Sequence, residues 1–516
     1  MTNKSATASL PLTTGIWKVI TASSVGTLIE WYDFYIYGSL ATVIAGQFFP
    51  KSNPTAATLS TLATFAAGFL VRPFGALVFG RLGDLIGRKY TFLLTLTLMG
   101  GSTFAIGLVP GYERIGFVAP LLVLLLRLLQ GLALGGEYGG AATYVAEHSP
   151  SNRRGYFTSW IQTTATLGLF LSLGVILLTR HLLDPDQARS IEKFNDWGWR
   201  IPFLGSIVLV IISIYIRLRM QESPLFARLK TEGKVSVNPL KESFGRKQNL
   251  KIVLLALFGC ALGQGVVFYA NQFYAQFFLE NVCHIDFDQS RTMLLWAILL
   301  ATPFFVVFGG WSDRVGRKWI MLGGMLLSVV SYHVIFNRFL SISDTRNKIE
   351  LTDQKEIKTS VSFIGHTGNL VRTSATITRY EGGFALTETT KDTVYSGGRT
   401  SLKPDVKTTK TLGSGGYWAT VVLLFILIFF VTMSYGPIAA FMVELFPTKI
   451  RYTSMSLPYH IGNGVFGGLT PFVATLLTTM FVDNKLVGLW YPVIMAGICV
   501  LIGALYIPGR RVSEEL

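Results

Sequence analysis

Apolar runs of about 20 residues recur along most of the chain. Each run is long enough to cross the roughly 30 Å hydrocarbon core of a bilayer as a helix. The pattern therefore predicts an all-α membrane protein with about twelve transmembrane helices. The spans are expected at residues 17–46, 58–79, 90–110, 117–137, 156–179, 199–218, 250–279, 292–310, 319–340, 417–442, 453–480 and 487–507.

Lys and Arg gather in the short polar segments that follow every second predicted span. The rule that cytoplasmic loops are enriched in basic residues then places both termini and these loops in the cytoplasm. The largest basic group surrounds residues 221–249, which we interpret as a cytoplasmic linker. This linker would separate an N-terminal six-helix bundle, residues 1–220, from a C-terminal bundle, residues 250–516.

A glycine-spaced, charged motif occurs once in each half. Residues 80–89 read GRLGDLIGRK and residues 309–318 read GGWSDRVGRK, and their aspartates are 229 positions apart. A repeated hairpin between apolar helices indicates a duplicated membrane transporter. Acidic residues further along each half are expected to pair with the basic ones and to latch the cytoplasmic side. The predicted gating residues are Gly80, Gly83, Asp84, Gly87, Arg88, Asp313, Gly316, Arg317, Glu147 and Glu444.

Residues 341–415 interrupt the apolar pattern with a polar segment rich in Thr, Ser, Gly and Lys. Glu147 and Glu444 are 297 positions apart, so 68 residues have entered the second half relative to the first repeat. The segment follows the ninth span, which predicts an extracytoplasmic insertion between helices 9 and 10. Alternation over residues 373–380 and glycine pairs at 382–383 and 397–398 predict short strands and turns. The insertion is either a tolerated loop or a module that binds a partner or collects substrate.

Composition limits the other function classes. Half of the residues are hydrophobic and 14% are charged, which is typical of a membrane protein. The net charge of +16 follows from the basic loops, so no nucleic-acid partner is expected. Three scattered cysteines do not form a disulfide framework. The sequence has no Walker loop, metal-ligand pattern or nucleophile–base pattern, so we expect no enzyme activity, no cofactor and no metal.

Two carboxylates, Glu30 and Asp33, lie three positions apart within the first predicted span. A charge at mid-membrane costs about 2.5–3.5 kcal/mol on insertion scales, so such residues usually face a cavity and act in transport. We predict that they carry the coupled proton, with Tyr32 and Tyr35 as substrate contacts. Pairing with a structural arginine is the alternative for either carboxylate.

The fourth predicted span supplies Arg127 and, ten residues later, Glu137, and we predict that both take part in proton coupling. Because an arginine keeps its charge, Arg127 needs a carboxylate or an anionic substrate nearby. We expect Asp33 to be that carboxylate, so that a proton on Asp33 would release Arg127 for a substrate. This competition would couple the movement of the proton to the movement of the substrate. Arg72 is a second candidate anion contact.

Polar residues in two spans of the second half extend the expected binding site. They are better explained by pore lining than by core packing, although a hydrogen-bonded core position is the alternative for the histidine. The candidates are Gln264, Tyr269, Asn271, Gln272, His460 and Asn463.

These motifs together resemble the major facilitator superfamily, and within it the metabolite:proton symporters that carry proline/betaine, shikimate, α-ketoglutarate or citrate. The resemblance rests on EWYDF at 30–34, RPFG at 72–75, the two hairpins, RLLQGLALGGE at 127–137 and ELFPT at 444–448. It covers nearly the whole chain except the insertion. It implies proton-coupled uptake across a bacterial inner membrane, and it supports Asp33 and Arg127 as coupling or binding residues.

We therefore predict a monomeric transporter, made of two pseudo-symmetric bundles around a central cavity, that works by alternating access. Its expected activity is proton symport of a small organic acid or zwitterion. Arg127 and Arg72 favour an anion, whereas Glu30, Asp33 and the tyrosines could equally accept a quaternary amine. Two alternatives remain: a proton-driven exporter, and a membrane sensor that does not transport and uses the 341–415 insertion as its receptor.

Overall fold

The computed structural model describes residues 12–50, 53–86, 88–136, 138–219, 244–346, 348–351, 355–364, 369–394, 405–446 and 451–507. Each of the twelve predicted spans falls on helix within these residues, and several spans are built from two or three consecutive helices. In the first half the helices are α1 (Leu12–Ser39), α2 (Ala41–Phe48), α3 (Pro54–Leu70), α4 (Arg72–Ile86), α5 (Arg88–Leu108), α6 (Tyr112–Ile115), α7 (Val118–Gly135), α8 (Tyr138–His148), α9 (Arg154–Leu183), α10 (Gln187–Lys193) and α11 (Arg200–Arg219).

The second half follows residues 220–243, which lie outside the described part of the chain. Its helices are α14 (Lys247–Ala256), α15 (Leu262–Tyr269), α16 (Ala275–Asn281), α17 (Phe287–Ala301), α18 (Pro303–Val315), α19 (Arg317–Ser343), α20 (Ser414–Tyr435), α21 (Ile438–Leu445), α22 (Arg451–Tyr459), α23 (Gly468–Met480) and α24 (Trp490–Tyr506). Three π-helical turns interrupt the inner helices: η3 (Leu257–Ala261), η4 (Ala270–Tyr274) and η8 (His460–Gly467). Such turns are rare and occur frequently at functional sites.

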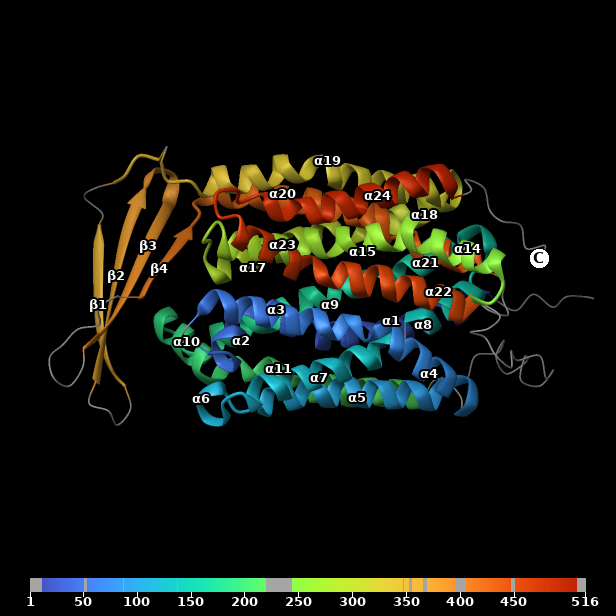
Figure 1. Ribbon diagram of the computed structural model, residues 1–516, viewed down its shortest axis with the longest axis horizontal. Coiled ribbons are helices and arrows are strands. Elements are labelled where there is room, and N and C mark those ends of the chain that lie inside the picture. Colours follow the sequence, from blue (N-terminus) through green and yellow to red (C-terminus); the bar gives the residue numbers. More distant parts are fainter. Residues whose placement is uncertain are drawn as a thin grey trace, which may run out of the picture.

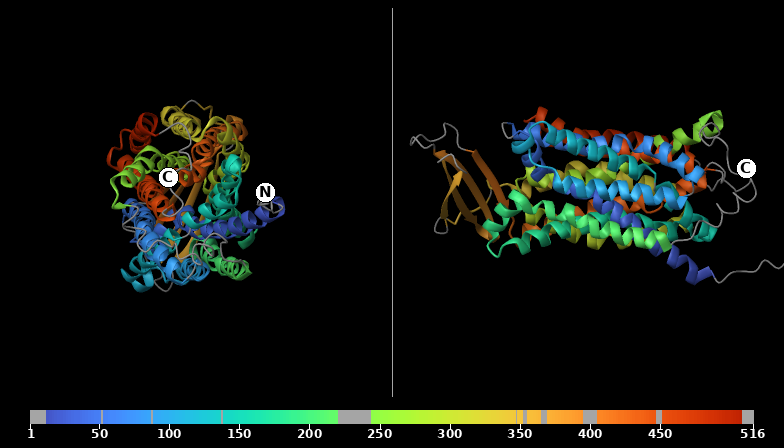
Figure 2. Two further views of the ribbon diagram at one scale, coloured as in Figure 1. Left: turned by 90° about the vertical axis from the view of Figure 1, so that its right-hand side faces the viewer. Right: turned by 90° about the horizontal axis from the view of Figure 1, so that it is seen from below.

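The helices run side by side along the long axis of the molecule (Figure 1). Helices of the first half lie on one side of this axis and most helices of the second half on the other. Figure 2 shows the small sheet at one end of the bundle and the helices running from it toward the opposite end, where α11 ends and α14 begins. We call these the sheet end and the linker end. Contacts between α9 and α18, and between α3 and α23, join the two halves.

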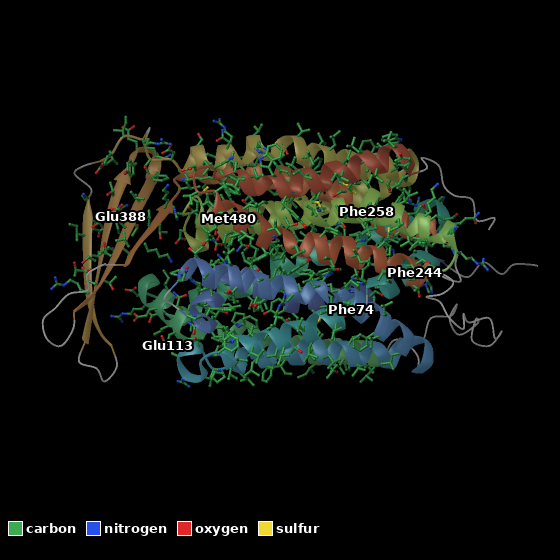
Figure 3. The ribbon with its side chains drawn as sticks, in the orientation of Figure 1. Phe74, Glu113, Phe244, Phe258, Glu388 and Met480 are labelled. Atoms are coloured by element: carbon green, nitrogen blue, oxygen red, sulfur yellow. The ribbon has the colours of Figure 1, made fainter. Side chains whose placement is uncertain are left out.

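The outer surface of the bundle is apolar, as a bilayer requires. In the described residues, nine helices are long and apolar enough to cross a membrane, and α5 and α11 contain shorter apolar stretches. Phe74 and Met480 are 63% and 66% exposed on this surface (Figure 3). Side chains such as these are stable against lipid tails, which replace the protein core as their apolar surroundings.

The insertion forms a four-stranded antiparallel meander in the order β1 (Glu356–Ile364), β2 (Asn369–Tyr380), β3 (Phe384–Val394) and β4 (Asp405–Thr411). Gly382 and Gly383, with φ of 76° and 79°, form the turn between β2 and β3. Only glycine adopts this region readily, so the first predicted glycine break is a turn for a steric reason. The predicted strand content of the insertion is therefore confirmed. Residues 397–398 lie outside the described residues.

At the linker end, the two halves approach each other closely where α9 crosses α18. A Cβ atom added to Gly155 would lie 2.3 Å from the carbonyl oxygen of Gly309. A side chain at Gly155 or Gly309 would collide with the backbone of the opposite helix. Because a backbone atom cannot rotate out of the way as a flexible side chain can, the two helices would have to move apart. Small residues of this kind allow membrane helices to pack at short range.

Replacing Gly155 by leucine should therefore open this crossing and lower the stability of the protein by about 1–3 kcal/mol, the usual cost of overpacking. Gly174 lies on the same helix, and a Cβ atom added there would have no atom within 4 Å. Gly174→Leu is therefore the matched control. Tryptophan fluorescence of the purified protein during heating measures both variants. Equal unfolding temperatures for the two variants would contradict close packing at Gly155.

Candidate functional site

Arg127 of α7 lies in the centre of the first half and is fully buried. Its Nη1 donates hydrogen bonds to the carbonyl oxygen of Phe34 at 3.3 Å and to Oε1 of Gln130 at 2.8 Å. Thr103 on α5 accepts a bond of 2.7 Å from Nε2 of Gln130, which orients the amide. The rings of Phe34 and Tyr37 lie 4.0 and 4.6 Å from the guanidinium carbon. Nε and Nη2 of Arg127 have no hydrogen-bond partner among the described residues.

Arg72, the first residue of α4, is 1% exposed and lies against aromatic rings instead of acids. Its guanidinium carbon is 4.0 Å from the centre of the Phe69 ring and 4.4 Å from that of Phe34. Its Nε and Nη2 also lack hydrogen-bond partners within the described ranges. In the described part of the chain, neither Arg72 nor Arg127 is paired with a carboxylate. Cation–π contacts offset part of the cost of burying each charge.

The second half brings its polar residues to this same place. Phe69 packs edge-on against Tyr269 with ring centres 5.0 Å apart, and Gly464 of η8 lies beside the Arg72 side chain. Tyr35, Tyr269, Tyr435 and Tyr459 all lie near Arg72. His460 also lies near Arg72. The two halves therefore meet around the buried guanidinium of Arg72.

Many polar atoms around Arg72 are buried and lack a hydrogen-bond partner in the described structure, which is costly unless a ligand or water supplies one. Beside Arg72 they are the hydroxyls of Tyr35 and Tyr269 and both ring nitrogens of His460. Nε2 of Gln264 and both amide atoms of Gln272 are also buried without a partner among the described residues. Asn463 donates to Oε1 of Gln264 at 3.1 Å. Tyr35, Tyr269 and His460, three of the predicted binding residues, thus lie beside Arg72 with unused hydrogen-bonding capacity.

Asn271 and Tyr32 are engaged elsewhere. The Asn271 amide donates to the carbonyl oxygen of Leu427 at 2.7 Å, and its oxygen accepts from Tyr332 at 2.6 Å. The Tyr32 hydroxyl donates to the carbonyl oxygen of Pro202 on α11 at 2.8 Å. In this conformation both side chains join helices within one half, and their bonds are already directed away from a ligand.

Asp33 is 1% exposed, and its Oδ1 has no hydrogen-bond partner among the described residues. Its Oδ2 lies 3.4 Å from the position of a Cβ at Gly100 on α5, next to Val210 on α11. The expected ion pair with Arg127 is absent, because Asp33 faces α5 and α11 while Arg127 reaches the Phe34 carbonyl. Glu30 is also 1% exposed. Glu137 lies outside the described residues.

Stacked tyrosines join the halves on the linker side of the arginines. The rings of Tyr138 and Tyr459 are parallel with centres 3.7 Å apart. Gln162 donates to the Tyr138 hydroxyl at 2.5 Å, and the hydroxyls of Tyr435 and Tyr459 are 2.9 Å apart. This contact continues the polar cluster from the first half into the second.

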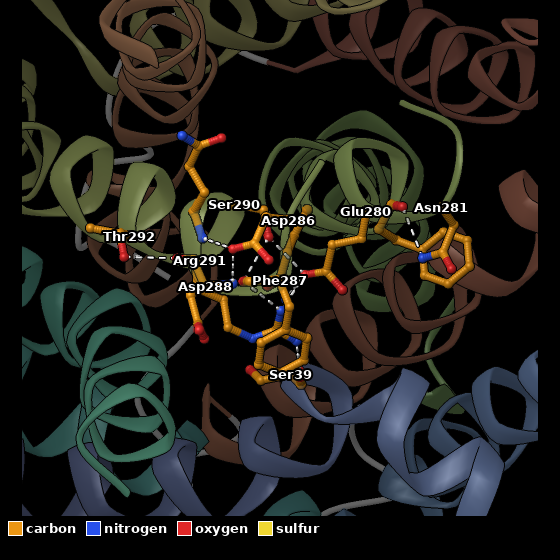
Figure 4. Close-up of polar contacts among 12 residues, drawn as sticks. Ser39, Glu280, Asn281, Asp286, Phe287, Asp288, Ser290, Arg291 and Thr292 are labelled. Carbon is orange, nitrogen blue, oxygen red and sulfur yellow. Dashed lines mark hydrogen bonds and ion pairs between the residues drawn. The ribbon is translucent and has the colours of Figure 1, made fainter. Parts of the chain in front are cut away.

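At the sheet end, four charged residues form what we call the sheet-end layer: Arg180, Glu280, Asp288 and Arg291. Arg180 of the first half contacts Asp288 of the second at 2.6 Å. Arg291 is buried, pairs with Glu280 and also donates to the carbonyl oxygen of Ser39 on α1 (Figure 4). The layer therefore joins α9 to α17 by an ion pair, and α1 to α17 by a charged hydrogen bond from Arg291, which also pairs with Glu280 of α16.

A small cavity separates this layer from the aromatic centre. It is lined by Ser39, Phe65, Phe273, Glu280 and Arg291, among others, and its volume is about 20 Å³. A cavity of that size holds about one water molecule. Phe65 and Phe273, with ring centres 5.7 Å apart, line this cavity together with Arg291 and Glu280 of the sheet-end layer.

At the linker end, Asp313 accepts hydrogen bonds from the backbone N–H groups of Gly155 and Tyr156 at 2.8 and 2.9 Å. Both groups belong to the first turn of α9, where free N–H groups favour an anion. Arg317 contacts Asp313 at 3.1 Å and binds Glu444 through two bonds of 2.6 Å. Gly316, with φ of 103°, makes the sharp turn between α18 and α19.

We call Asp313, Arg317 and Glu444 the linker-end layer. The corresponding contacts of the first hairpin cannot be compared with it. Gly87 lies outside the described residues. The side chains of Asp84, Arg88 and Glu147 lie outside them as well, as do the surroundings of Gly80 and Gly83.

Comparison with known proteins identifies the family. A family model described as "Sugar (and other) transporter" matches residues 18–234. The inner membrane metabolite transport protein YhjE of Escherichia coli K12 is 32% identical over 492 residues, which are 94% of this chain and 92% of that protein. The proline/betaine transporter of the same organism is 36% identical over 328 residues, 61% of this chain and 63% of that one. The proton:xylose symporter XylE, solved with bound 6-bromo-6-deoxy-D-glucose, superposes over 97% of this chain and 98% of its own with a TM-score of 0.66 at 14% identity.

The chain belongs to the major facilitator superfamily.

It is accordingly a multi-pass membrane protein and a transporter of the sugar and metabolite group, and it is not an enzyme. The likeness to XylE, at 14% identity, shows a shared fold. The predicted fold class, twelve helices with a β-containing insertion, is confirmed.

Some residues of this transporter were not predicted from the sequence. Arg180, Glu280, Asp288 and Arg291 lie at the ends of spans, where charges usually face lipid headgroups and water. Gln130 was visible as a polar residue three positions after Arg127, a spacing that places both on one helix face. Tyr138, Tyr435 and Tyr459 gave no periodic signal that separates a stacked interface from ordinary packing.

The orientation of Arg127 by Gln130 and Thr103 can be tested by removing one hydroxyl. Thr103→Val keeps the shape but leaves the Gln130 amide without its acceptor, which should cost about 1–3 kcal/mol of stability. Thr97→Val on the same helix is the control, because the Thr97 hydroxyl is exposed and bonds only to the carbonyl oxygen of Leu93. Thermal unfolding of the two purified variants is compared. A Thr103 variant as stable as the Thr97 variant would refute a structural role for this chain of bonds.

Proposed function

We propose that the protein is a proton symporter that imports a small organic acid or a zwitterion with a carboxylate group by alternating access. It would act as a monomer in a bacterial inner membrane, with both termini cytoplasmic and the sheet outside. Residues 1–220 and 250–516 would form the two moving bundles. The names of two relatives, a metabolite transport protein and a proline/betaine transporter, agree with this substrate class.

One observation carries the proposal: two buried arginines meet in the centre of the bundle without a carboxylate partner among the described residues. An arginine stays charged in proteins, and an isolated buried charge is expensive. A substrate carboxylate would supply the missing anion. Arg72 is the better contact, because it lies between the halves, whereas Arg127 is held by Gln130 and the Phe34 carbonyl.

The surroundings of Asp33 suggest how a proton would take part. A carboxylate without donors around it costs several kcal/mol to bury. In the described structure, Asp33 has neither a cation nor a donor near its free oxygen. In this closed conformation it would therefore hold a proton, and would release it in a conformation that brings a donor or Arg127 close. The coupling would then require a movement of α1 relative to α5 and α7, instead of direct competition within one static ion pair.

Reconstituted protein under an imposed pH gradient tests the function. A screen of labelled carboxylates and betaines should find a substrate that accumulates with inward proton flow. Accumulation that requires the opposite gradient would indicate an exporter. Specific binding without flux for every compound would favour a sensor.

Asp33→Asn should abolish uphill accumulation while leaving exchange of substrate down its own gradient, because the amide cannot carry the proton. Asp483→Asn, in an exposed turn of the sheet end, is the control. Uptake with and without the gradient is measured for both variants. Retained uphill uptake by the Asp33 variant removes this residue from the coupling role.

Arg72→Gln should weaken substrate binding about 10- to 100-fold, since a charged hydrogen bond contributes about 1.5–3 kcal/mol. Arg72→Lys should recover part of the affinity by keeping the charge, though not the planar pair of donors. Arg379→Gln on the exposed sheet serves as control. Binding is measured by displacement of the labelled substrate. Unchanged affinity in Arg72→Gln would show that another group binds the carboxylate.

A further inference from the structure

The insertion is hydrogen-bonded directly to the turn between α16 and α17. The N–H of Lys410 in β4 donates to the carbonyl oxygen of His284 at 2.7 Å, and the N–H of Asp286 donates to the carbonyl oxygen of Lys410 at 2.9 Å. Ile285 and Lys410 thus form a parallel bridge. The turn is therefore bridged to β4 at one residue.

Gln289, in the first turn of α17, adds a second attachment. Its Nε2 donates to the carbonyl oxygen of Leu412, and its Oε1 accepts from the N–H of Leu412, both at 2.8 Å. The Gln289 amide thus bonds both the N–H and the carbonyl oxygen of Leu412, as the backbone of a neighbouring strand would. The contact holds the end of β4 against the beginning of α17.

This same turn carries the charged residues that close the sheet end. Glu280 precedes it, and Asp288 and Arg291 follow it within the first turns of α17. Asp286 caps α17 by accepting from the N–H groups of Asp288 and Gln289, each at 3.0 Å. The orientation of Asp288 and Arg291 toward the first half therefore depends on the conformation of the α16–α17 turn.

The turn also has an unfavourable backbone conformation. His284 has φ of 59°, the left-handed region that a non-glycine residue adopts at a cost. Such strain persists where surrounding contacts hold it, and the His284 carbonyl is the group bound by Lys410. Without the sheet, this turn would lose the contacts that keep it in this shape.

We propose that the insertion is a working part of the sheet-end gate. The backbone of β4, together with the bonds between Gln289 of α17 and Leu412, holds the α16–α17 turn in place. Held in this way, the turn directs Asp288 and Arg291 toward the first half. This role of the insertion goes beyond the proposed function. It rests on the proposed function in one respect, because the sheet-end layer is a gate only if the protein transports a substrate. Gln289 is then a positioning residue that acts through Arg291. The sheet sets how readily the sheet end opens.

Cys283 provides a natural reporter, because it lies in this turn and is 1% exposed. Burial raises the pKa of its thiol to about 11. At pH 7.5 fewer than about one thiol in a thousand is then the reactive thiolate. If the turn is released, the pKa falls toward its ordinary value and labelling accelerates. Cys260 and Cys499 are buried within the membrane part and report loss of the whole fold.

The experiment measures the rate at which a water-soluble maleimide labels Cys283 in the purified protein, with peptide mass spectrometry to separate the three cysteines. Gln289→Ala should raise the Cys283 rate about tenfold, the effect expected from two lost hydrogen bonds, and leave Cys260 and Cys499 unlabelled. Glu388→Gln, on the insertion but in the middle of β3, is the control and should match the wild type.

A double-mutant comparison tests whether Gln289 acts through the gate. Arg291→Gln should accelerate Cys283 labelling, and adding Gln289→Ala should have little further effect, since both release the same turn. Independent, multiplying effects would overturn the positioning role. If Gln289→Ala labels all three cysteines, the milder Gln289→Glu, which loses only the donor, decides the question. An unchanged Cys283 rate in a folded Gln289 variant overturns the proposal.

This test needs no substrate and no knowledge of orientation. If the wild type shows no uptake of any compound, the proposed function fails while the labelling result on the tether stands. If uptake occurs but labelling is unchanged in folded variants, the tether proposal fails alone. Where both hold, Gln289→Ala should also change the uptake rate without changing substrate affinity at the central site.

Discussion

The structure depends on the burial of two guanidinium groups near the middle of a membrane-sized bundle. Arg72 and Arg127 have no carboxylate partner among the described residues, and aromatic rings cover both. Rings stabilise a cation by about 0.5–2 kcal/mol, which is less than the cost of removing it from water. The remaining deficit makes the centre of the molecule a place that gains from an incoming anion. The unused hydroxyl and imidazole groups near Arg72 point to the same conclusion, because each of them also gains from a polar ligand.

Charged side chains join the two halves at both ends of the bundle. Removing one partner of a buried ion pair costs about 3–5 kcal/mol, so neither end opens freely. Arg180 with Asp288, and Asp313 with the N–H groups of Gly155 and Tyr156, each cross from one half to the other. Opening one end must therefore be compensated by new interactions elsewhere in the molecule. A ligand shifts such an equilibrium only by its different affinity for the two states. A substrate that pairs with Arg72, between the halves, meets this requirement, because its surroundings change when the halves separate.

Much of the fold could be predicted because span length is set by the bilayer. The spans, the position of the insertion and its strands followed from apolar runs, repeat offsets and glycine pairs. The burial of Asp33 and Arg127 also followed, since charges inside an apolar span avoid lipid. Their orientation could not be predicted: a helix turn of about 100° per residue places Asp33 toward α5 while Phe34, its neighbour, contacts Arg127. The sheet-end layer was missed because Arg180 and Arg291 lie at span ends, where sequence alone cannot separate a buried pair from a charge in the headgroup region.

The insertion is the feature for which the interpretation from sequence spacing differs most from the contacts in the structure. Spacing alone describes 68 extra residues in one loop, which a surface loop tolerates at small entropic cost. A passive loop would need only its two ends to be close together. Here the strand that closes the insertion also supplies backbone partners to a different turn, far earlier in the chain, and holds His284 in a strained conformation. A loop without a role has no physical reason to stabilise strain at the gate. The sheet and the gate are therefore better understood as one unit, in which the hydrogen bonds of β4 and the ion pairs of Arg180 and Arg291 stabilise the same closed conformation.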